Sequence, residues 1–507
     1  MTPPCSQKPL TVLEMLEASV LRAPGKTALC GPGGTLSFEE LLAQTLALGR
    51  FLAGAGLGRG ARVGILARKS PESIVAFLGT AAAGGVAFTV DYNLSPENLT
   101  RIFSLTRPEI LIVEDRYVGD ARAALGVDTQ TRLLVIGSRT PRQDWLWEEA
   151  LRETACPTAL PQLCADEVVY LNLTSGTSGQ PKAVATTHAN LFWNTCGAVQ
   201  ALHLSPEDVH LCLFPIFGHP HEIFLRALYL GGTAVLLDSL LPSAIAAAAQ
   251  LHRVTTMMAA TTIYQTILRA PNLDPAALST VRIAECGGMH LSPGVFAQFL
   301  ETFGVRIVPV WGSTETAGIA FAADPCEAYV PGSVGRPSPH YEAILVDEFG
   351  GNCEPGEVGE LWLSGPGVCS AYTLEGAETR SLTREGWFCS GDFFRRDAQG
   401  RFFFAGRRTG MLKVAGMRVY PTEVEDVLAA HPAVCEVAVC ATEHASRGEV
   451  PMAVIVLKEG CEADPQALRA HCESLLPPYK VPKVFEFRPA LPKSAGGKIL
   501  YSKLKSV

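Results

Sequence analysis

The chain has 507 residues, which is too many for a single hydrophobic core, so we expect two or more domains. Hydrophobic residues make up 48% of the chain and charged residues 18%, a balance typical of a soluble globular protein. The formal net charge of −8 argues against the basic surface that nucleic-acid binding requires, so no nucleic-acid partner is expected. Composition leaves the oligomeric state open.

Cysteine usage and the N-terminus bear on the cellular compartment. Fifteen cysteines are scattered without CxxC pairs or Cys/His ligand spacing, which indicates reduced thiols in a cytoplasmic protein. Residues 1–8 contain no apolar segment of the signal-peptide kind. The longest apolar stretch, residues 73–90, is interrupted by Gly79, Gly84 and Gly85, so it predicts a buried helix and a strand rather than a membrane span.

Helical and strand patterns alternate along most of the chain. Residues 37–55 have helical spacing, and Ser37 with Glu40 has the arrangement of a capping box. The elements expected after it are strands at 61–66, 86–90, 209–214, 233–237, 255–259 and 306–310, and helices at 72–83 and 244–251. This alternation predicts α/β layers with largely parallel sheets.

The pattern changes from about Tyr341 onward. Strands at 343–347 and 359–363, separated by a turn-rich stretch, predict a β-rich part at about 341–406. We therefore expect a large N-terminal domain of residues 1–406 and a small α+β domain of residues 407–507.

Patterns inside the small domain support this division. Thr422 with Glu425 predicts a capping box for a helix through Ala430, and strands are expected at 434–441 and 452–457.

The segment from Leu173 to Lys182 is the most informative part of the sequence. It concentrates hydroxyls, glycines and one lysine directly after the apolar run 168–171. Glycines let the backbone approach an anion, successive N–H groups form an anion-binding nest, and lysine adds a point charge. The order does not match a Walker loop, so the segment suggests nucleotide binding without the usual NTPase chemistry. The alternative is a polar surface linker.

Four further motifs follow in order. They are Trp311-Gly-Ser-Thr-Glu315, Phe388-Cys-Ser-Gly-Asp392, the run from Gly406 to Arg418, and Pro492-Lys-Ser-Ala-Gly-Gly-Lys498. Each is weak alone. Together with the 173–182 loop, they resemble the adenylate-forming (AMP-binding) superfamily, which includes acyl- and aryl-CoA synthetases, nonribosomal peptide synthetase adenylation domains and luciferases. The resemblance covers essentially the whole chain.

Two features narrow the resemblance to free-standing acyl/aryl-CoA synthetases. The segments Tyr420 to Glu425 and Tyr479 to Pro482 resemble that group more than peptide-synthetase domains. The segment from Phe214 to His219 lacks the acidic residue that pairs with an amino acid's ammonium group in the amino-acid-activating relatives. Because a buried ammonium without a carboxylate is costly, the resemblance favours a carboxylic acid that lacks an α-amine.

The family's reaction joins a carboxylate to the α-phosphate of ATP, releases pyrophosphate, and then transfers the acyl group to a thiol. By resemblance, Thr174 to Lys182 hold the β- and γ-phosphates, Thr314 bonds the α-phosphate and Glu315 holds Mg²⁺. Asp392 takes the ribose hydroxyls with help from Arg407, and Lys498 contacts the α-phosphate and the acid. The other implied contacts are, for phosphate, Ser175, Gly176, Thr177 and Ser178; for adenine, Gly287, Gly288 and Trp311; and for the acid, His219, Met289, Val310 and Gly312. His219 and His221 equally suit a structural role.

Two positions depart from the family pattern. Ala183 stands where glycine is common after the loop lysine, and Thr409 stands at the hinge between the domains, where Asp or Lys is usual. The implied cofactors and substrates are ATP, Mg²⁺ and a small-molecule carboxylic acid. The implied acceptor is coenzyme A. The alternatives are the phosphopantetheine of a separate acyl carrier protein and a non-thiol nucleophile.

Overall fold

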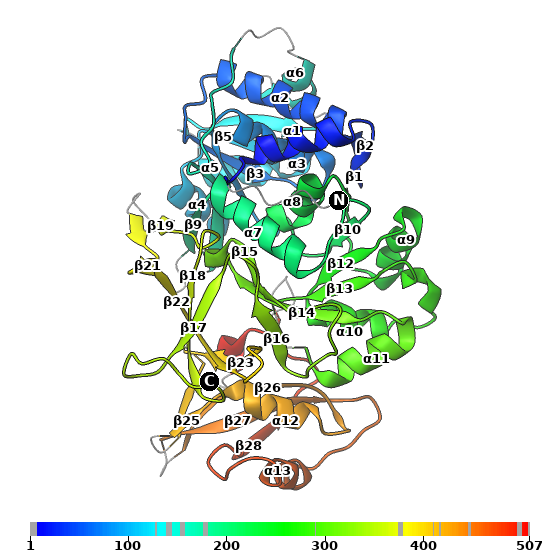
Figure 1. Ribbon diagram of the computed structural model, residues 1–507, viewed down its shortest axis with the longest axis vertical. Coiled ribbons are helices and arrows are strands. Elements are labelled where there is room, and N and C mark those ends of the chain that lie inside the picture. The colour runs from blue at the N-terminus through cyan, green and yellow to red at the C-terminus, as the bar shows by residue number, and fades with distance from the viewer. Residues whose placement is uncertain are drawn as a thin grey trace.

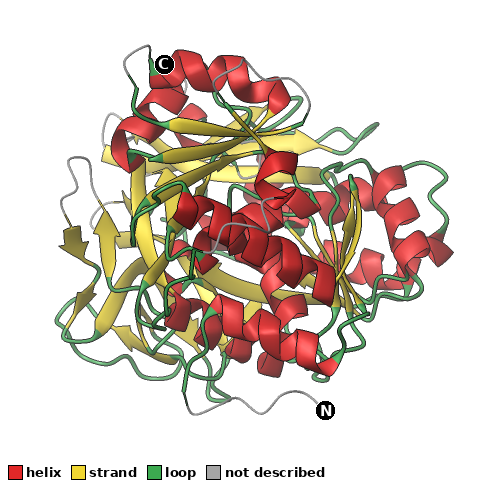
Figure 2. Ribbon diagram, turned by 90° about the horizontal axis from the view of Figure 1, so that it is seen from above, coloured by secondary structure: helices red, strands yellow, loops and turns green. Residues whose placement is uncertain are grey.

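The computed structural model describes residues 8–126, 129–137, 144–152, 158–175, 181–288, 291–373, 379–408, 410–414, 417–444, 448–493 and 499–504. The molecule is elongated, with the N-terminal helices at one end and the C-terminal sheet at the other (Figure 1). The described strands form three sheets of fourteen, nine and five strands. Helices pack between and outside the two larger sheets (Figure 2).

The largest sheet has a parallel half and an antiparallel half. Its path runs β17-β18-β22-β23-β16-β15-β14-β13-β12-β10-β11-β1-β2, with β21 paired to β22. The strands β10 to β14 and the β1–β11 pair run parallel, whereas β14 onward to β23 runs antiparallel. Its strands are β1 Thr27–Gly31, β2 Gly34–Ser37, β10 Val209–Cys212, β11 Thr233–Val235, β12 Thr256–Ala259, β13 Ile283–Cys286, β14 Ile307–Ser313, β15 Gly318–Ala322, β16 Ser333–Pro337, β17 Glu342–Val346, β18 Val358–Ser364, β21 Thr383–Arg384, β22 Trp387–Arg396 and β23 Phe402–Arg407.

The second sheet has the order β20-β19-β9-β8-β4-β3-β5-β6-β7. The strands from β8 to β7 are parallel, and the β8–β9 and β9–β19 pairs are antiparallel. Its strands are β3 Arg62–Leu66, β4 Val86–Thr89, β5 Ile110–Glu114, β6 Arg132–Ile136, β7 Trp145–Leu146, β8 Val168–Ser175, β9 Pro181–Thr187, β19 Ala371–Thr373 and β20 Thr379–Ser381.

The third sheet belongs to the C-terminal part and has its own buried core. Its strands are β24 Leu412–Val414, β25 Met417–Val419, β26 Val434–His444, β27 Gly448–Leu457 and β28 Val484–Phe487. Leu412, Val424, Val439, Ile455 and Leu468 join these strands to the two helices that cover them. An ion pair links this sheet to the part of the molecule that holds the largest sheet. Arg269 Nη1 lies 3.7 Å from Glu436 Oε1 on β26.

The helices explain the layering. One apolar cluster joins inner faces of both large sheets to the helices between them, and two further clusters lie beneath the outer helices. The helices are α1 Val12–Arg22, α2 Phe38–Gly54, α3 Pro71–Ala82, α4 Pro96–Thr106, α5 Val118–Leu125, α6 Trp147–Arg152, α7 His188–Ala201, α8 Pro220–Leu230, α9 Pro242–His252, α10 Thr261–Leu268, α11 Pro293–Phe303, α12 Pro421–Ala429 and α13 Pro465–Glu473. The 3₁₀ turns are η1 Asp115–Tyr117, η2 Pro275–Leu278, η3 Thr314–Thr316 and η5 Tyr501–Lys503.

Of the two expected capping boxes, one is present and one is wrong. Ser37 and Glu40 cap α2 reciprocally, through bonds of 3.2 and 2.8 Å. Tyr420, and not Thr422, is the N-cap of α12, without a side-chain cap bond. The Thr422 hydroxyl donates instead to the carbonyl of Ala405, and Glu425 accepts from the Val439 N–H at 2.7 Å. Both side chains are engaged by tertiary partners, so neither is available to its own helix.

Two other expectations concern the chain as a whole. In the part that the structure describes, thirteen cysteines are free thiols, as the scattered spacing predicts. None of the described helices combines the length and apolarity needed to cross a membrane. The division at residues 406 and 407 remains a prediction.

Candidate active site

The glycine-rich segment connects two strands of the second sheet. β8 and β9 pair antiparallel, with Thr174 opposite Lys182 and Ser175 opposite Pro181. Thr174 and Ser175 therefore end one strand where Pro181 and Lys182 begin the other. Gly176, Thr177 and Ser178, expected at the tip, lie outside the described residues.

Lys182 and Glu315 are brought together by a tyrosine. The Lys182 ammonium lies 5.5 Å from the ring centroid of Tyr372, and the Tyr372 hydroxyl donates to Glu315 Oε1 at 2.6 Å. Lys182 belongs to β9, Tyr372 to β19 and Glu315 to η3, so three distant segments meet here.

The turn that carries Thr314 and Glu315 is held by its own short bonds. Ser313 caps it reciprocally with Thr316, and Cys369 N–H donates to the Glu315 carbonyl at 2.8 Å. Within the described residues, Glu315 Oε2 has no hydrogen-bond partner, whereas Oε1 accepts from Tyr372. A carboxylate with one oxygen fixed and one open fits a hard cation such as Mg²⁺, which prefers oxygen ligands.

Asp392 is a buried carboxylate on β22 with two cationic or polar partners. Its register partner on β23 is Arg407, whose Nε lies 3.2 Å from Asp392 Oδ1. Trp311 also lies close enough to this carboxylate to favour its ionised form. Burial raises the pKa of Asp392 to about 6, although Arg407 and Trp311 oppose the rise.

The charge of Glu315 also raises the pKa of Asp392, so the two carboxylates act on one another through space. Lys182, Glu315 and Asp392 therefore belong to one electrostatic site. A polyanionic ligand with bound cations and ribose hydroxyls matches this mixture of charges.

The expected adenine and acid contacts lie where parallel strands of the large sheet end. Gly287 follows β13, and a Cβ added to it would lie 3.1 Å from Val310 Cγ2 on β14. A Cβ on Gly312 would lie 2.1 Å from the Gly318 carbonyl oxygen, so β14 and β15 approach too closely for any side chain there. Gly288 has a φ of +77°. Ligands of open α/β sheets bind at such carboxyl ends.

The two histidines differ in their surroundings. His219 is the N-cap of α8 and its Nδ1 lies 3.2 Å from the Asn172 amide. His221 is buried and its Nε2 donates to the Ala317 carbonyl at 2.8 Å. Burial lowers the pKa of His221 to about 4, so this ring is neutral at physiological pH. His221 is thus bound to the residue that ends the Glu315 turn.

Three other predicted residues cannot be placed. Lys498, Thr409 and Met289 lie outside the described residues, so their assigned roles remain predictions.

The comparisons with known proteins cover both parts of the chain. Residues 16–373 match the model of the AMP-binding enzyme family, and residues 423–498 match the AMP-binding enzyme C-terminal domain. The chain belongs to the AMP-binding enzyme family.

Two CoA ligases and one solved structure match this chain over nearly their whole length. A long-chain-fatty-acid–CoA ligase from Bacillus subtilis (strain 168) is 30% identical, with 97% of this chain and 94% of the relative covered. An indoleacetate–CoA ligase from Aromatoleum aromaticum is 30% identical, with 94% of each covered. The crystal structure of a benzoate CoA ligase from Burkholderia xenovorans LB400 has a TM-score of 0.89 at 28% identity, covering 98% of this chain and 100% of that one. These matches confirm the expected superfamily, the α/β fold with a smaller C-terminal domain, and the class of AMP-forming acid–thiol ligase.

Sequence reasoning missed two residues of this candidate site. Tyr372 lies on a strand without a local motif, and only its pairing with β9 places it beside Lys182. Glu360 accepts from the Gly391 N–H at 3.1 Å and pairs with Arg408, so it supports the turn before Asp392. Neither position had a signal in its own neighbourhood of the sequence. Both are identified by strand pairing alone.

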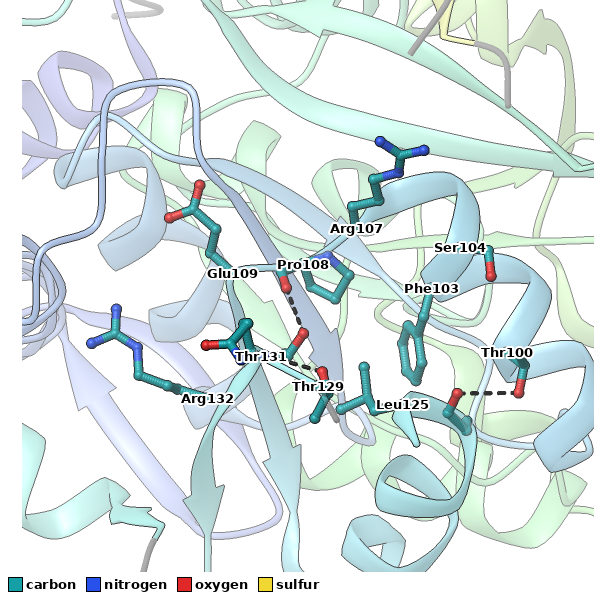
Figure 3. Close-up of a pocket in the computed structure, with 12 residues that line it drawn as sticks. Thr100, Phe103, Ser104, Arg107, Pro108, Glu109, Leu125, Thr129, Thr131 and Arg132 are labelled. Atoms are coloured by element: carbon teal, nitrogen blue, oxygen red, sulfur yellow. Dashed lines mark hydrogen bonds between the residues drawn. The ribbon is translucent and has the colours of Figure 1, made fainter. Parts of the chain in front are cut away.

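A separate hollow of about 490 Å³ lies between α4, α5 and the starts of β5 and β6. Phe103, Leu125 and Thr131 line it, while the guanidinium groups of Arg107 and Arg132 point away from its centre (Figure 3). Arg132 is already occupied, because it donates to the Ala55 carbonyl and lies over the Trp145 ring. None of the residues expected to contact the acid or ATP lines this hollow.

Proposed function

We propose that the protein activates a carboxylic acid with ATP, forming acyl-AMP and pyrophosphate, and then transfers the acyl group to the thiol of coenzyme A. The observation that carries this proposal is the convergence of Lys182, Glu315 and Asp392 from three distant segments. Family membership and CoA-ligase relatives support the same reaction.

The first half-reaction brings anionic oxygens of the acid and ATP together, so positive charge must be concentrated there. Lys182 would contact the β- and γ-phosphates, together with the loop at 174–178. Glu315 would hold Mg²⁺, which neutralises phosphate charge when bound. Thr314 and Lys498 would contact the α-phosphate, and Lys498 would also contact the acid.

The nucleoside would be held by Asp392 and the residues around it. A buried carboxylate accepts two hydroxyl donors well, because charge-assisted bonds are stronger where water is excluded. Arg407 would keep this carboxylate ionised. Trp311, which lies close to Asp392, would present its indole beside the adenine, with Gly287 and Gly288 on the other side.

The acid would occupy the ends of β10, β13 and β14, near His219, Met289, Val310 and Gly312. The segment from Phe214 to His219 offers no carboxylate for an α-ammonium, which supports an acid without an α-amine. The relatives act on a fatty acid, indoleacetate and benzoate, so the comparisons leave the acid's identity to experiment.

Coenzyme A is the favoured acceptor because CoA ligases match this chain from end to end. A carrier protein and a nitrogen or oxygen nucleophile are the less favoured alternatives as acceptor.

The proposal is tested by acid-dependent exchange of labelled pyrophosphate into ATP across a panel of aryl, alkyl, hydroxy and amino acids. We expect exchange with at least one acid that lacks an α-amine. Exchange that requires an α-amino acid would contradict the assignment of the acid class.

A further inference from the structure

Tyr372 stands between two groups that the proposed function uses, and it belongs to neither of their segments. It is the central residue of β19, which pairs antiparallel with β9, with Tyr372 opposite Val184 and Thr373 opposite Ala183. Figure 1 shows β19 beside β9. This pairing brings the side chain to the strand that begins with the loop lysine.

The hydroxyl of Tyr372 orients the carboxylate of Glu315. It donates to Oε1 at 2.6 Å, a short bond of the charge-assisted kind. With Oε1 fixed, rotation about the last side-chain bond is restricted and Oε2 keeps one direction. A metal ligand held this way needs less ordering when the cation arrives.

The ring of Tyr372 supports Lys182. The ammonium lies 5.5 Å from the ring centroid, within the range of a cation–π contact. One side chain therefore uses its polar end on the carboxylate and its aromatic face on the ammonium.

The segment around Tyr372 is anchored to the same turn by a second contact. The N–H of Cys369 donates to the Glu315 carbonyl at 2.8 Å, and the buried Cys369 thiol lies 3.6 Å from the Thr186 hydroxyl on β9. Residues 369–372 thus tie η3, the turn between β14 and β15 of the large sheet, to the second sheet. Movement of this segment would displace Glu315 and Lys182 together.

We propose that Tyr372 is a positioning residue that presets Glu315 for the metal of metal–ATP and keeps Lys182 aligned with the phosphates. This inference rests on the proposed function, since it assigns a support to residues that the proposed function places at ATP.

Two substitutions separate the two ends of the side chain. Tyr372→Phe removes the hydroxyl and keeps the ring, whereas Tyr372→Leu removes both. The matched control is Tyr117→Phe, which removes a tyrosine hydroxyl from η1, on another part of the second sheet.

Two readouts follow: Mn²⁺ binding to the protein–ATP complex by electron paramagnetic resonance, and the Mg²⁺ dependence of pyrophosphate exchange. We expect Tyr372→Phe to weaken Mn²⁺ binding about ten- to a hundredfold, the scale of losing a hydrogen-bond partner of a metal ligand. Half-maximal exchange should need correspondingly more Mg²⁺, with ATP affinity in the absence of metal unchanged. Tyr372→Leu should in addition weaken metal-free ATP binding.

Unchanged Mn²⁺ binding in Tyr372→Phe, or an equal change in Tyr117→Phe, would overturn the inference. Equal loss of metal-free ATP binding in both Tyr372 variants would contradict the positioning role and show that Tyr372 acts only by packing. Wild-type protein that binds Mn²⁺–ATP without exchanging pyrophosphate with any acid would contradict the proposed function and not the role of Tyr372.

Discussion

Arg407 Nε lies 3.2 Å from Asp392 Oδ1, and the two residues are register partners on neighbouring strands. The pair is asymmetric, because the Arg407 side chain is 64% exposed and the Asp392 side chain only 6%. The arginine therefore compensates the buried charge from the solvent side and does so incompletely. The raised pKa of Asp392, about 6, is the consequence.

This pKa predicts a pH dependence of ATP binding. In the proposed function the ribose hydroxyls bind the ionised carboxylate of Asp392, so protons should compete with ATP below a pH of about 6. We expect the Kd for ATP to rise about tenfold between pH 7 and pH 5, following the ionised fraction of a group with this pKa. Calorimetric titration at several pH values measures it. Asp392→Asn should bind ATP weakly at every pH, and the tenfold change should disappear; if the variant keeps it, Asp392 is not the titrating group.

Protonation of Asp392 should weaken ATP binding, but in the free protein it favours the folded state. Between its ordinary pKa of 3.8 and about 6, Asp392 binds more protons folded than unfolded. Its contribution to the free energy of unfolding therefore falls as pH rises through this window and is constant above it. Asp392→Asn should flatten this part of the pH–Tm profile.

The buried cluster of Arg226 with Glu222 and Glu285 predicts a stability effect. All three side chains are at most 5% exposed, Arg226 Nη1 lies 2.7 Å from Glu285 Oε2, and its Nη2 donates to Glu222. Arg226→Met would leave two buried carboxylates without a cation and should cost about 3–5 kcal/mol.

Thermal unfolding checks this, with Arg101→Met as the matched control. Arg101 forms an exposed i,i+4 pair with Glu97, worth less than about 1 kcal/mol. Adding Glu285→Gln to Arg226→Met should recover part of the loss. A control that lowers Tm as much as Arg226→Met would show that burial is not the cause.

Lys498→Ala should abolish adenylation and leave thioester formation from supplied acyl-AMP intact. Loss of a charge at the transition state costs on the order of 10²–10³ in rate. Pyrophosphate exchange reports the first step and acyl-CoA formation from synthetic acyl-AMP the second. Full exchange in the variant would remove Lys498 from the mechanism.

Thr409→Pro should affect the second half-reaction more than the first. Proline fixes φ near −65°, which a hinge that changes φ and ψ does not tolerate. The Arg269–Glu436 ion pair between the two parts would break in such a rotation, but Arg269 is half exposed, so breaking it costs less than about 1 kcal/mol. We expect pyrophosphate exchange to survive and thioester release to fall sharply. Equal loss of both activities would indicate misfolding, and loss of neither would exclude the hinge.

Local patterns predicted the elements that depend on local chemistry. Ser37 and Glu40 cap α2 as expected, and β3, β4, β10, β11 and β12 lie within two residues of the expected strands. The parallel strands β1, β5, β6, β7 and β13 were not predicted. The Thr422–Glu425 box failed because Ala405, Val439 and Tyr501 offered those side chains better partners from other segments.

Buried charged residues were the main structural feature that could not be predicted from the sequence. Lys69 is only 2% exposed and donates to the Cys212 carbonyl at 3.0 Å, although an isolated lysine in sequence predicts a solvated one. Lys182, Glu315, Asp392 and Arg407 were predicted through motifs, whereas Tyr372 depends on the pairing of β19 with β9, which no local pattern encodes.

The most direct test of the two-step reaction is mass spectrometry of products formed with an acid that supports pyrophosphate exchange. With ATP, Mg²⁺ and that acid alone, we predict enzyme-bound acyl-AMP in an amount close to that of the protein, and free pyrophosphate. Addition of coenzyme A should convert the acyl-AMP to acyl-CoA and AMP within one turnover. Formation of ADP, or acyl-AMP that persists in the presence of coenzyme A, would contradict the account.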